Sequence, residues 1–188
     1  MLDGRIQNSE VVVVVSNRVE CGAVSYAKDH GIPTTVYPCT KSGKGMDDDE
    51  LLADLKEREI DAIVLAGYMK MIPPNVVRAF PRRILNIHPA LLPSFGGKGM
   101  YGMNVHRAVV AMGARFSGPT VHFVDEIYDH GPILAQAVVA VSPTDSPEQV
   151  AAKVLKEEHR LYPEAVAALC EGRITWREDG IPIMWTPR

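Results

Sequence analysis

ILNIHP, residues 84–89, is the stretch that decides the fold. Its apolar start predicts a buried strand over residues 84–86, and the proline predicts a turn soon afterwards. Asn86 and His88 are two positions apart at the end of this strand, and side chains with that spacing leave an extended chain on the same face. We therefore expect the amide and the imidazole to converge on one point beyond the sheet.

Strands and helices alternate before this stretch. Residues 10–17 predict a buried strand, because their β-branched side chains run without polar alternation. Further strands are expected at 34–37 and 62–66, and helices at 21–30, 47–59 and 73–80. This order predicts an α/β fold with a mostly parallel sheet.

The pattern changes after His88. Residues 96–99, GGKG, predict a loop, and residues 105–112 a helix. Strands at 120–124 and 133–141, joined by a short acidic connection, predict an antiparallel extension of the sheet. A helix from Ser146 to about Cys170 and a terminal edge strand at 174–176 would follow. We find no repeat or long linker, so residues 1–188 are expected to form a single domain.

Composition excludes several classes of function. The chain has 188 residues, 46% of them hydrophobic, and a formal net charge of −3, which gives no electrostatic argument for binding nucleic acid or a membrane. Its three cysteines are too scattered for a zinc site or a disulfide framework, so we expect no metal and a reducing compartment. No run suits a membrane span, signal peptide or transit peptide, which predicts a soluble intracellular protein of the cytoplasm or an organelle stroma.

Asp129, in the stretch YDHG at residues 128–131, completes a candidate catalytic group with Asn86 and His88. An amide N–H can stabilise an oxyanion, an imidazole can hold or move a proton, and a carboxylate can keep the imidazole basic. Each residue alone is more often structural. Ligands of open α/β sheets bind beyond the carboxyl ends of strands, however, which favours a functional interpretation. No serine or cysteine nucleophile accompanies the group, so the attacking atom should belong to a substrate.

Four motifs carry a resemblance to a known family. They are NIHPALLP at 86–93, GPTVHFV continuing to YDHGP at 118–132, AGYMKMI at 66–72 and EEHRLYP at 157–163. By these motifs and by their order along the chain, the sequence resembles the phosphoribosylglycinamide formyltransferases, a family of folate-dependent enzymes of purine synthesis within the formyl-folate transferase superfamily. The resemblance implies a Rossmann-like formyltransferase domain and transfer of a formyl group from 10-formyltetrahydrofolate to the amine of glycinamide ribonucleotide, without a metal. It leaves a homodimer possible.

The resemblance also implies roles for individual residues. Asn86, His88 and Asp129 match the catalytic trio, and Asn86 and Asp129 also lie among the folate-binding positions. Glu158 matches an acid that holds ribose hydroxyls, and the turn at Leu92–Pro93 is expected to be cis. The remaining folate-binding positions are Met69, Lys70, Met71 and Ile72. Lys70 replaces a common arginine and would offer a point charge instead of a bidentate contact; core packing is the alternative for the two methionines.

One part of the family pattern is absent. The family begins with a strand and a Gly/Ser/Asn-rich loop that holds the substrate phosphate, whereas residues 11–15 of this chain match the second strand. We therefore expect an N-terminally truncated domain without the first strand, which would leave neighbouring strands unpaired. The loop at 96–99 is interpreted as an ordinary turn and is not assigned the missing role.

Two other functions remain open. A hydrolase of the same superfamily would give the formyl group to water, although Pro89 and the continuation ALLP at 90–93 favour a transferase. A non-catalytic folate-binding fragment is the second alternative, because the phosphate loop is absent. Transfer to methionyl-tRNA is disfavoured, since the sequence shows neither a tRNA-binding domain nor a basic tract.

Overall fold

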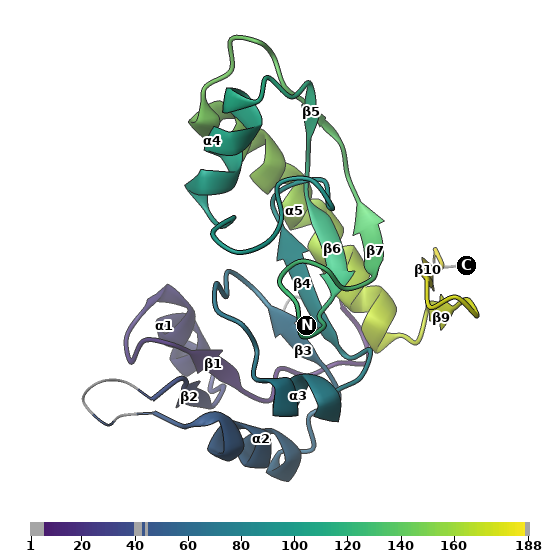
Figure 1. Cartoon of the computed structure of the whole chain (residues 1–188). Coiled ribbons are helices and arrows are strands. Elements are labelled where there is room, and N and C mark those ends of the chain that lie inside the picture. Colours follow the sequence, from purple (N-terminus) through teal and green to yellow (C-terminus); the bar gives the residue numbers. More distant parts are fainter. Residues whose placement is uncertain (1–5, 40–42, 44, 187–188) are drawn as a thin grey trace.

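A four-stranded sheet in the order β3–β4–β6–β7 carries the centre of the molecule (Figure 1). The structure is a computed structural model that describes residues 6–39, 43 and 45–186. The strands are β3 (Ile63–Leu65), β4 (Ile84–His88), β6 (Thr120–Phe123) and β7 (Ile133–Gln136). β3 and β4 are parallel, whereas β6 is antiparallel to both β4 and β7.

Helices cover both faces of β4. α2 (Asp48–Glu57) and α3 (Pro74–Ala79) pack on the core cluster that contains Ile84, and α5 (Pro147–Cys170) packs on the cluster that contains Leu85. Both residues are almost fully buried, at 1% and 0% exposure. Because alternate residues of a strand share a face, Asn86 and His88 continue the face of Ile84 towards the end of the strand.

The helix ends agree with their sequence signals. Asp47 caps α2 together with Glu50, and Ser146 caps α5 together with Gln149; each pair forms a capping box. α1 (Gly22–Asp29) and α4 (Met103–Ala111) also lie within about two residues of the expected bounds. The α/β class is therefore confirmed.

The strand predicted at 10–17 is much shorter than expected. β1 (Val14–Ser16) pairs in parallel with β2 (Thr34–Val36) in a separate two-stranded sheet. The register places residues 11–13 opposite residues 31–33, where Gly31 has a left-handed φ of 69° and Pro33 has no N–H to donate. The ladder therefore begins where the Val14 N–H donates to the carbonyl of Pro33 at 2.9 Å.

The predicted extent of the strand at 133–141 is wrong. The segment 133–141 divides into β7 and β8 (Val139–Ala140), because the chain leaves the sheet at the exposed Val138 and β8 pairs with β5 (Phe116–Ser117). β9 (Ile174–Trp176) has the bounds expected for the terminal edge strand, and it pairs with β10 (Pro182–Met184) in a hairpin separate from the main sheet.

The prediction of a mostly parallel sheet is also wrong. Of the six strand pairings among the described residues, two are parallel and four are antiparallel. The parallel strands fall into two separate pairs, because within the described part of the chain β1 is paired with β2 alone and β3 with β4 alone. Val15 and Val64, in the middle of β1 and β3, are 37% and 39% exposed. Each parallel pair therefore keeps an unpaired edge that carries partly exposed apolar side chains.

None of the helices in the described ranges combines the length and the apolar character needed to cross a lipid bilayer.

Candidate active site

His88 ends β4, two residues beyond the expected end of the strand, and its ring is buried. Its Nε2 lies 2.8 Å from the carbonyl oxygen of Phe95. A carbonyl only accepts hydrogen bonds, so Nε2 carries a proton and donates it to Phe95. Nδ1 is therefore the ring nitrogen that remains available for proton transfer.

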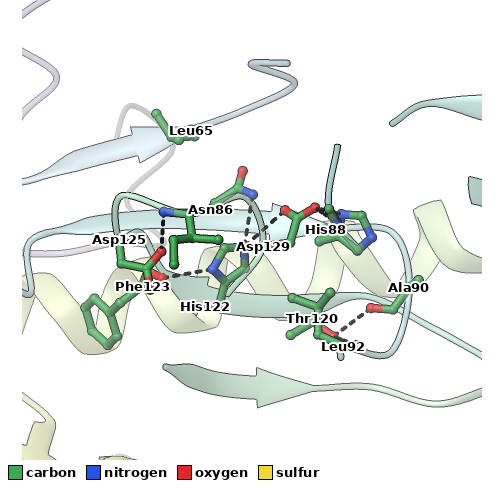
Figure 2. Close-up of polar contacts among 12 residues, drawn as sticks. Leu65, Asn86, His88, Ala90, Leu92, Thr120, His122, Phe123, Asp125 and Asp129 are labelled. Atoms are coloured by element: carbon green, nitrogen blue, oxygen red, sulfur yellow. Dashed lines mark hydrogen bonds and ion pairs between the residues drawn. The ribbon is translucent and has the colours of Figure 1, made fainter. Parts of the chain in front are cut away.

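Asp129 faces that nitrogen. Its Oδ2 lies 3.5 Å from His88 Nδ1 (Figure 2). The same oxygen accepts a hydrogen bond from the backbone N–H of Gly97 at 2.8 Å. The backbone of Asp129 is left-handed, with φ of 53°, a conformation that Asp tolerates better than most residues. The structure thus brings together the imidazole and the carboxylate that the sequence analysis selected.

The loop at 96–99 supports the acid. A Cβ atom on Gly96 would lie 2.5 Å from a methyl group of Leu92 and 3.2 Å from Cβ of Asp129, so a larger residue here would have to displace the Leu92 side chain. With the Gly97 N–H donated to the carboxylate, the glycine-rich turn fixes where Asp129 sits.

His122 is a site residue that the sequence analysis missed. It lies opposite Asn86 in the β4–β6 register, and its Nε2 is 3.1 Å from Asn86 Nδ2 and 3.7 Å from Asp129 Oδ1. The ring is only 2% exposed, and this burial lowers the pKa of His122 because the charged form loses its hydration. The available signal was a polar residue at every second position of an otherwise apolar strand, Thr120 and His122.

His106 is a second buried histidine that the sequence analysis missed. It lies on α4, and its Nδ1 has no hydrogen-bond partner among the described residues. Burial is the main cause that lowers the pKa of His106, and the nearby His88 lowers it further. Within the described part of the chain, no group of three or more His, Cys, Asp or Glu side chains is arranged to hold a metal ion.

Thr120 holds the turn that follows His88. Its hydroxyl donates to the carbonyl of Ala90 at 2.6 Å and accepts hydrogen bonds from the Leu92 N–H at 3.0 Å and from Gln136 Nε2 at 2.9 Å. Thr120 is fully buried, and all three of its hydrogen-bonding capacities are used. The Leu92–Pro93 peptide in this turn is cis, as expected.

The expected folate segment follows β3. The neighbouring strand β4 runs parallel to β3, so the segment begins at the same carboxyl end of the strands at which Asn86 and His88 lie. Met69 and Met71 are 59% and 39% exposed, and Lys70 is exposed too, which contradicts core packing of the two methionines. Ile72 differs, since it packs partly buried against the core cluster of α2 and α3.

Glu158 is half-buried in the middle of α5, and its carboxylate makes no hydrogen bond to a described residue. Burial raises the pKa of Glu158. One turn later on the same helix face, the hydroxyl of Tyr162 lies 2.8 Å and 2.9 Å from the carbonyl oxygens of Leu65 and Leu85. Tyr162 therefore fixes this part of α5 against β3 and β4. The structure does not bring Glu158 into contact with the trio.

Replacing Thr120 by valine tests the support of the turn. Thr120→Val removes the hydroxyl and leaves the buried Ala90 carbonyl and Leu92 N–H without their partner, so the free energy of unfolding should fall by about 2–3 kcal/mol. Urea unfolding measures this loss. Thr120→Ser keeps the hydroxyl and is the control; an equal loss in both variants would contradict the assigned role.

The comparisons with known proteins agree with this geometry. The model of the formyl transferase family matches residues 2–166. The chain is 54% identical to the chloroplastic phosphoribosylglycinamide formyltransferase of Arabidopsis thaliana, over 97% of this chain and 63% of that protein. It is 34% identical to the phosphoribosylglycinamide formyltransferase of Haemophilus influenzae, over 91% of this chain and 79% of that protein. The chain spans about three fifths of the length of the plant relatives it matches.

Solved structures give the same result. Glycinamide ribonucleotide transformylase 1 from Symbiobacterium toebii matches with a TM-score of 0.83 and 35% identity, over 98% of this chain and 84% of that one. A formyltetrahydrofolate deformylase from Pseudomonas syringae matches with a TM-score of 0.81 and 28% identity, over 94% of this chain and 57% of that one. The resemblance drawn from the four motifs is thus confirmed: the chain belongs to the formyl transferase family, among relatives that are phosphoribosylglycinamide formyltransferases.

Proposed function

We propose that this chain transfers a formyl group from 10-formyltetrahydrofolate to the primary amine of glycinamide ribonucleotide, in purine biosynthesis. Membership of the formyl transferase family implies a formyl-folate donor. The relatives named phosphoribosylglycinamide formyltransferase support the choice of acceptor. The observation that carries the proposal is the buried cluster in which His88 Nδ1 faces Asp129 at 3.5 Å, with Asn86 on the same strand face.

Asn86 and His88 would act on the developing negative charge. When the substrate amine bonds to the formyl carbon, the electron pair of the C=O bond moves to the oxygen. An N–H of Asn86 and a proton on His88 Nδ1 can stabilise this oxygen. The amine nitrogen then loses a proton, the bond to the folate nitrogen breaks, and that nitrogen gains a proton.

Asp129 would compensate the charge of the imidazolium and position a water for proton transfer from the amine to the folate nitrogen. Because Nε2 of His88 is engaged by the Phe95 carbonyl, the ring can serve this chemistry through Nδ1 alone. The Gly97 N–H keeps the carboxylate close to that nitrogen.

The segment Met69–Ile72 would bind the folate. Its exposed methionine side chains lie at the carboxyl ends of β3 and β4, near the candidate catalytic residues. They offer an apolar and polarisable surface to the flat ring of the folate. Lys70 would attract the carboxylates of the folate as a point charge. Asn86 would contact the donor from β4, and Asp129 from the turn between β6 and β7.

A hydrolase that gives the formyl group to water is the alternative, supported by the similarity to the deformylase from Pseudomonas syringae. Formate release distinguishes the two activities. A transferase forms the formylated ribonucleotide when both substrates are present and releases little formate without the amine. Rapid formate release in the absence of the ribonucleotide would contradict the proposed transfer.

A further strand would complete the fold. Among the residues that the structure describes, β1 and β3 each have an unpaired edge with a partly exposed valine, which is unfavourable for parallel strands. We propose that one more strand pairs with both of these edges in the complete domain, and that residues 1–188 are a truncated form of it. Its loop would supply the phosphate contacts for the ribonucleotide.

The sequence leads us to expect either the cytoplasm or an organelle stroma. The chloroplastic relatives support the organelle stroma as the location of this protein. A homodimer stays a prediction that light scattering can test.

Extending the chain tests the proposed strand. A chain lengthened at its N-terminus by a strand and a Gly/Ser/Asn-rich loop should resist urea better and transfer formyl groups at least about tenfold faster, because the ribonucleotide gains its anchor. The shorter chain should bind the folate more readily than the ribonucleotide, as measured by titration calorimetry. Equal stability and equal rates would show that no strand is needed.

Removing the amide of Asn86 tests the oxyanion contact. The substitution is made in the faster of the two chains, the original one or the N-terminally extended one. There Asn86→Ala should lower kcat by about 100- to 1000-fold, which is a loss of about 2.7–4 kcal/mol of transition-state stabilisation, with little change in folate affinity. Steady-state kinetics and a folate titration measure the two effects. Asn75→Ala is the control, since Asn75 contacts Asp49 at the surface. An unchanged kcat in Asn86→Ala would exclude the assigned role.

Glu158→Gln tests the contact to the ribose. Loss of a charged acceptor should raise KM for the ribonucleotide about tenfold, with kcat within about twofold. Glu157→Gln is the matched control, because Glu157 pairs with Arg160 at 2.9 Å on the surface of the same helix. The same KM in both variants would remove Glu158 from the substrate site.

A further inference from the structure

The proton on His122 has a fixed position. Its Nδ1 lies 2.9 Å from the carbonyl oxygen of Phe123. This oxygen can only accept, so Nδ1 must carry a proton. In the neutral ring Nε2 is then left with a lone pair, and it faces Asn86 across the β4–β6 ladder.

This lone pair decides how the Asn86 amide is turned. Nδ2 of Asn86 lies 3.1 Å from Nε2 and donates one of its two protons to it. The opposite orientation would place Oδ1 against a bare ring nitrogen, so that two acceptors would face each other. The second proton on Nδ2 is not used by His122 and is free for another acceptor.

The neutral form of His122 is favoured by its surroundings. Burial of the ring lowers the pKa of His122, and the nearby His88 acts in the same direction. The hydrogen bond to the Phe123 carbonyl, Asp129 with Oδ1 at 3.7 Å from Nε2, and Asp125 act in the opposite direction. Burial is the largest of these effects. A charged ring would present a second N–H to the amide, and the amide would have to turn over.

We propose that His122 is a positioning residue, whose neutral Nε2 holds the Asn86 amide so that one N–H points to the developing oxyanion. This inference rests on the proposed formyl transfer. His122 itself touches no reacting atom. It acts through the orientation of the Asn86 amide: one N–H points to the substrate, and the other donates to the ring. Figure 2 shows the contact between Asn86 and His122.

A double-mutant cycle tests the inference. His122→Leu should lower kcat by about 10- to 100-fold, less than loss of the amide itself, with KM for both substrates within about twofold. His122→Gln offers an amide oxygen as acceptor and should recover most of that loss. In the Asn86→Ala background, His122→Leu should change kcat by less than about twofold, because no amide remains to be oriented.

A destabilising variant far from the site is the control. Val154→Ala creates a cavity in the third core cluster, under α5, and should lower stability without changing kcat. An equal loss of kcat from His122→Leu in both backgrounds, or a glutamine variant as slow as the leucine variant, would overturn the inference.

The proton position is measured without turnover. The ¹⁵N chemical shifts of His122 in the unmodified chain should show Nδ1 protonated and Nε2 bare at neutral pH. A protonated Nε2 would overturn the inference. A chain that shows this pattern but transfers no formyl group would contradict the proposed function, while the orientation of Asn86 by His122 would stand.

Discussion

The antiparallel pairing of β4 with β6 is the interaction on which the rest of the site depends. It places Asn86 opposite His122 and His88 opposite Thr120, so that four polar side chains meet at one end of two apolar strands. One pair contains the candidate catalytic amide and the ring that orients it. The other contains the candidate catalytic imidazole and the hydroxyl that holds the turn after it. A shift of this register by one residue would turn the side chains of one strand to the opposite face, and neither pair would remain together.

The electrostatics of the cluster follow from burial. His88, His106 and His122 lie close together with one carboxylate, and water is largely excluded from them. Burial lowers the pKa values of His106 and His122, so the neutral form of both rings is favoured, and the neutral His122 ring serves as a hydrogen-bonding group. His88 is the ring whose free nitrogen faces Asp129 closely. His88 and His122 can therefore have different tasks, because a different ring nitrogen is engaged in each and a different group faces the other nitrogen.

Local features of the fold could be predicted from the sequence, and non-local ones could not. The capping boxes at Asp47 and Ser146 and the shared face of Asn86 and His88 depend on neighbours within a few residues. His122 was missed because its role depends on pairing with a strand 36 residues earlier. The extent of β1 was wrong for a similar reason, since it depends on whether residues 31–33 can continue the ladder. Periodicity says which residues can form a strand, whereas the partner decides how many of them do.

Backbone groups, and not side chains, fix the proton positions of this site. The Phe95 carbonyl engages His88, the Phe123 carbonyl engages His122, and the Gly97 N–H engages Asp129. Alanine scanning of residues 95, 97 and 123 would not delete any of these three contacts, because each belongs to the main chain. Side chains at these positions can therefore vary between related proteins as long as the course of the loops is kept. The course of the backbone therefore determines the tautomers of His88 and His122. A comparison that considers only side chains would miss the groups that fix these tautomers.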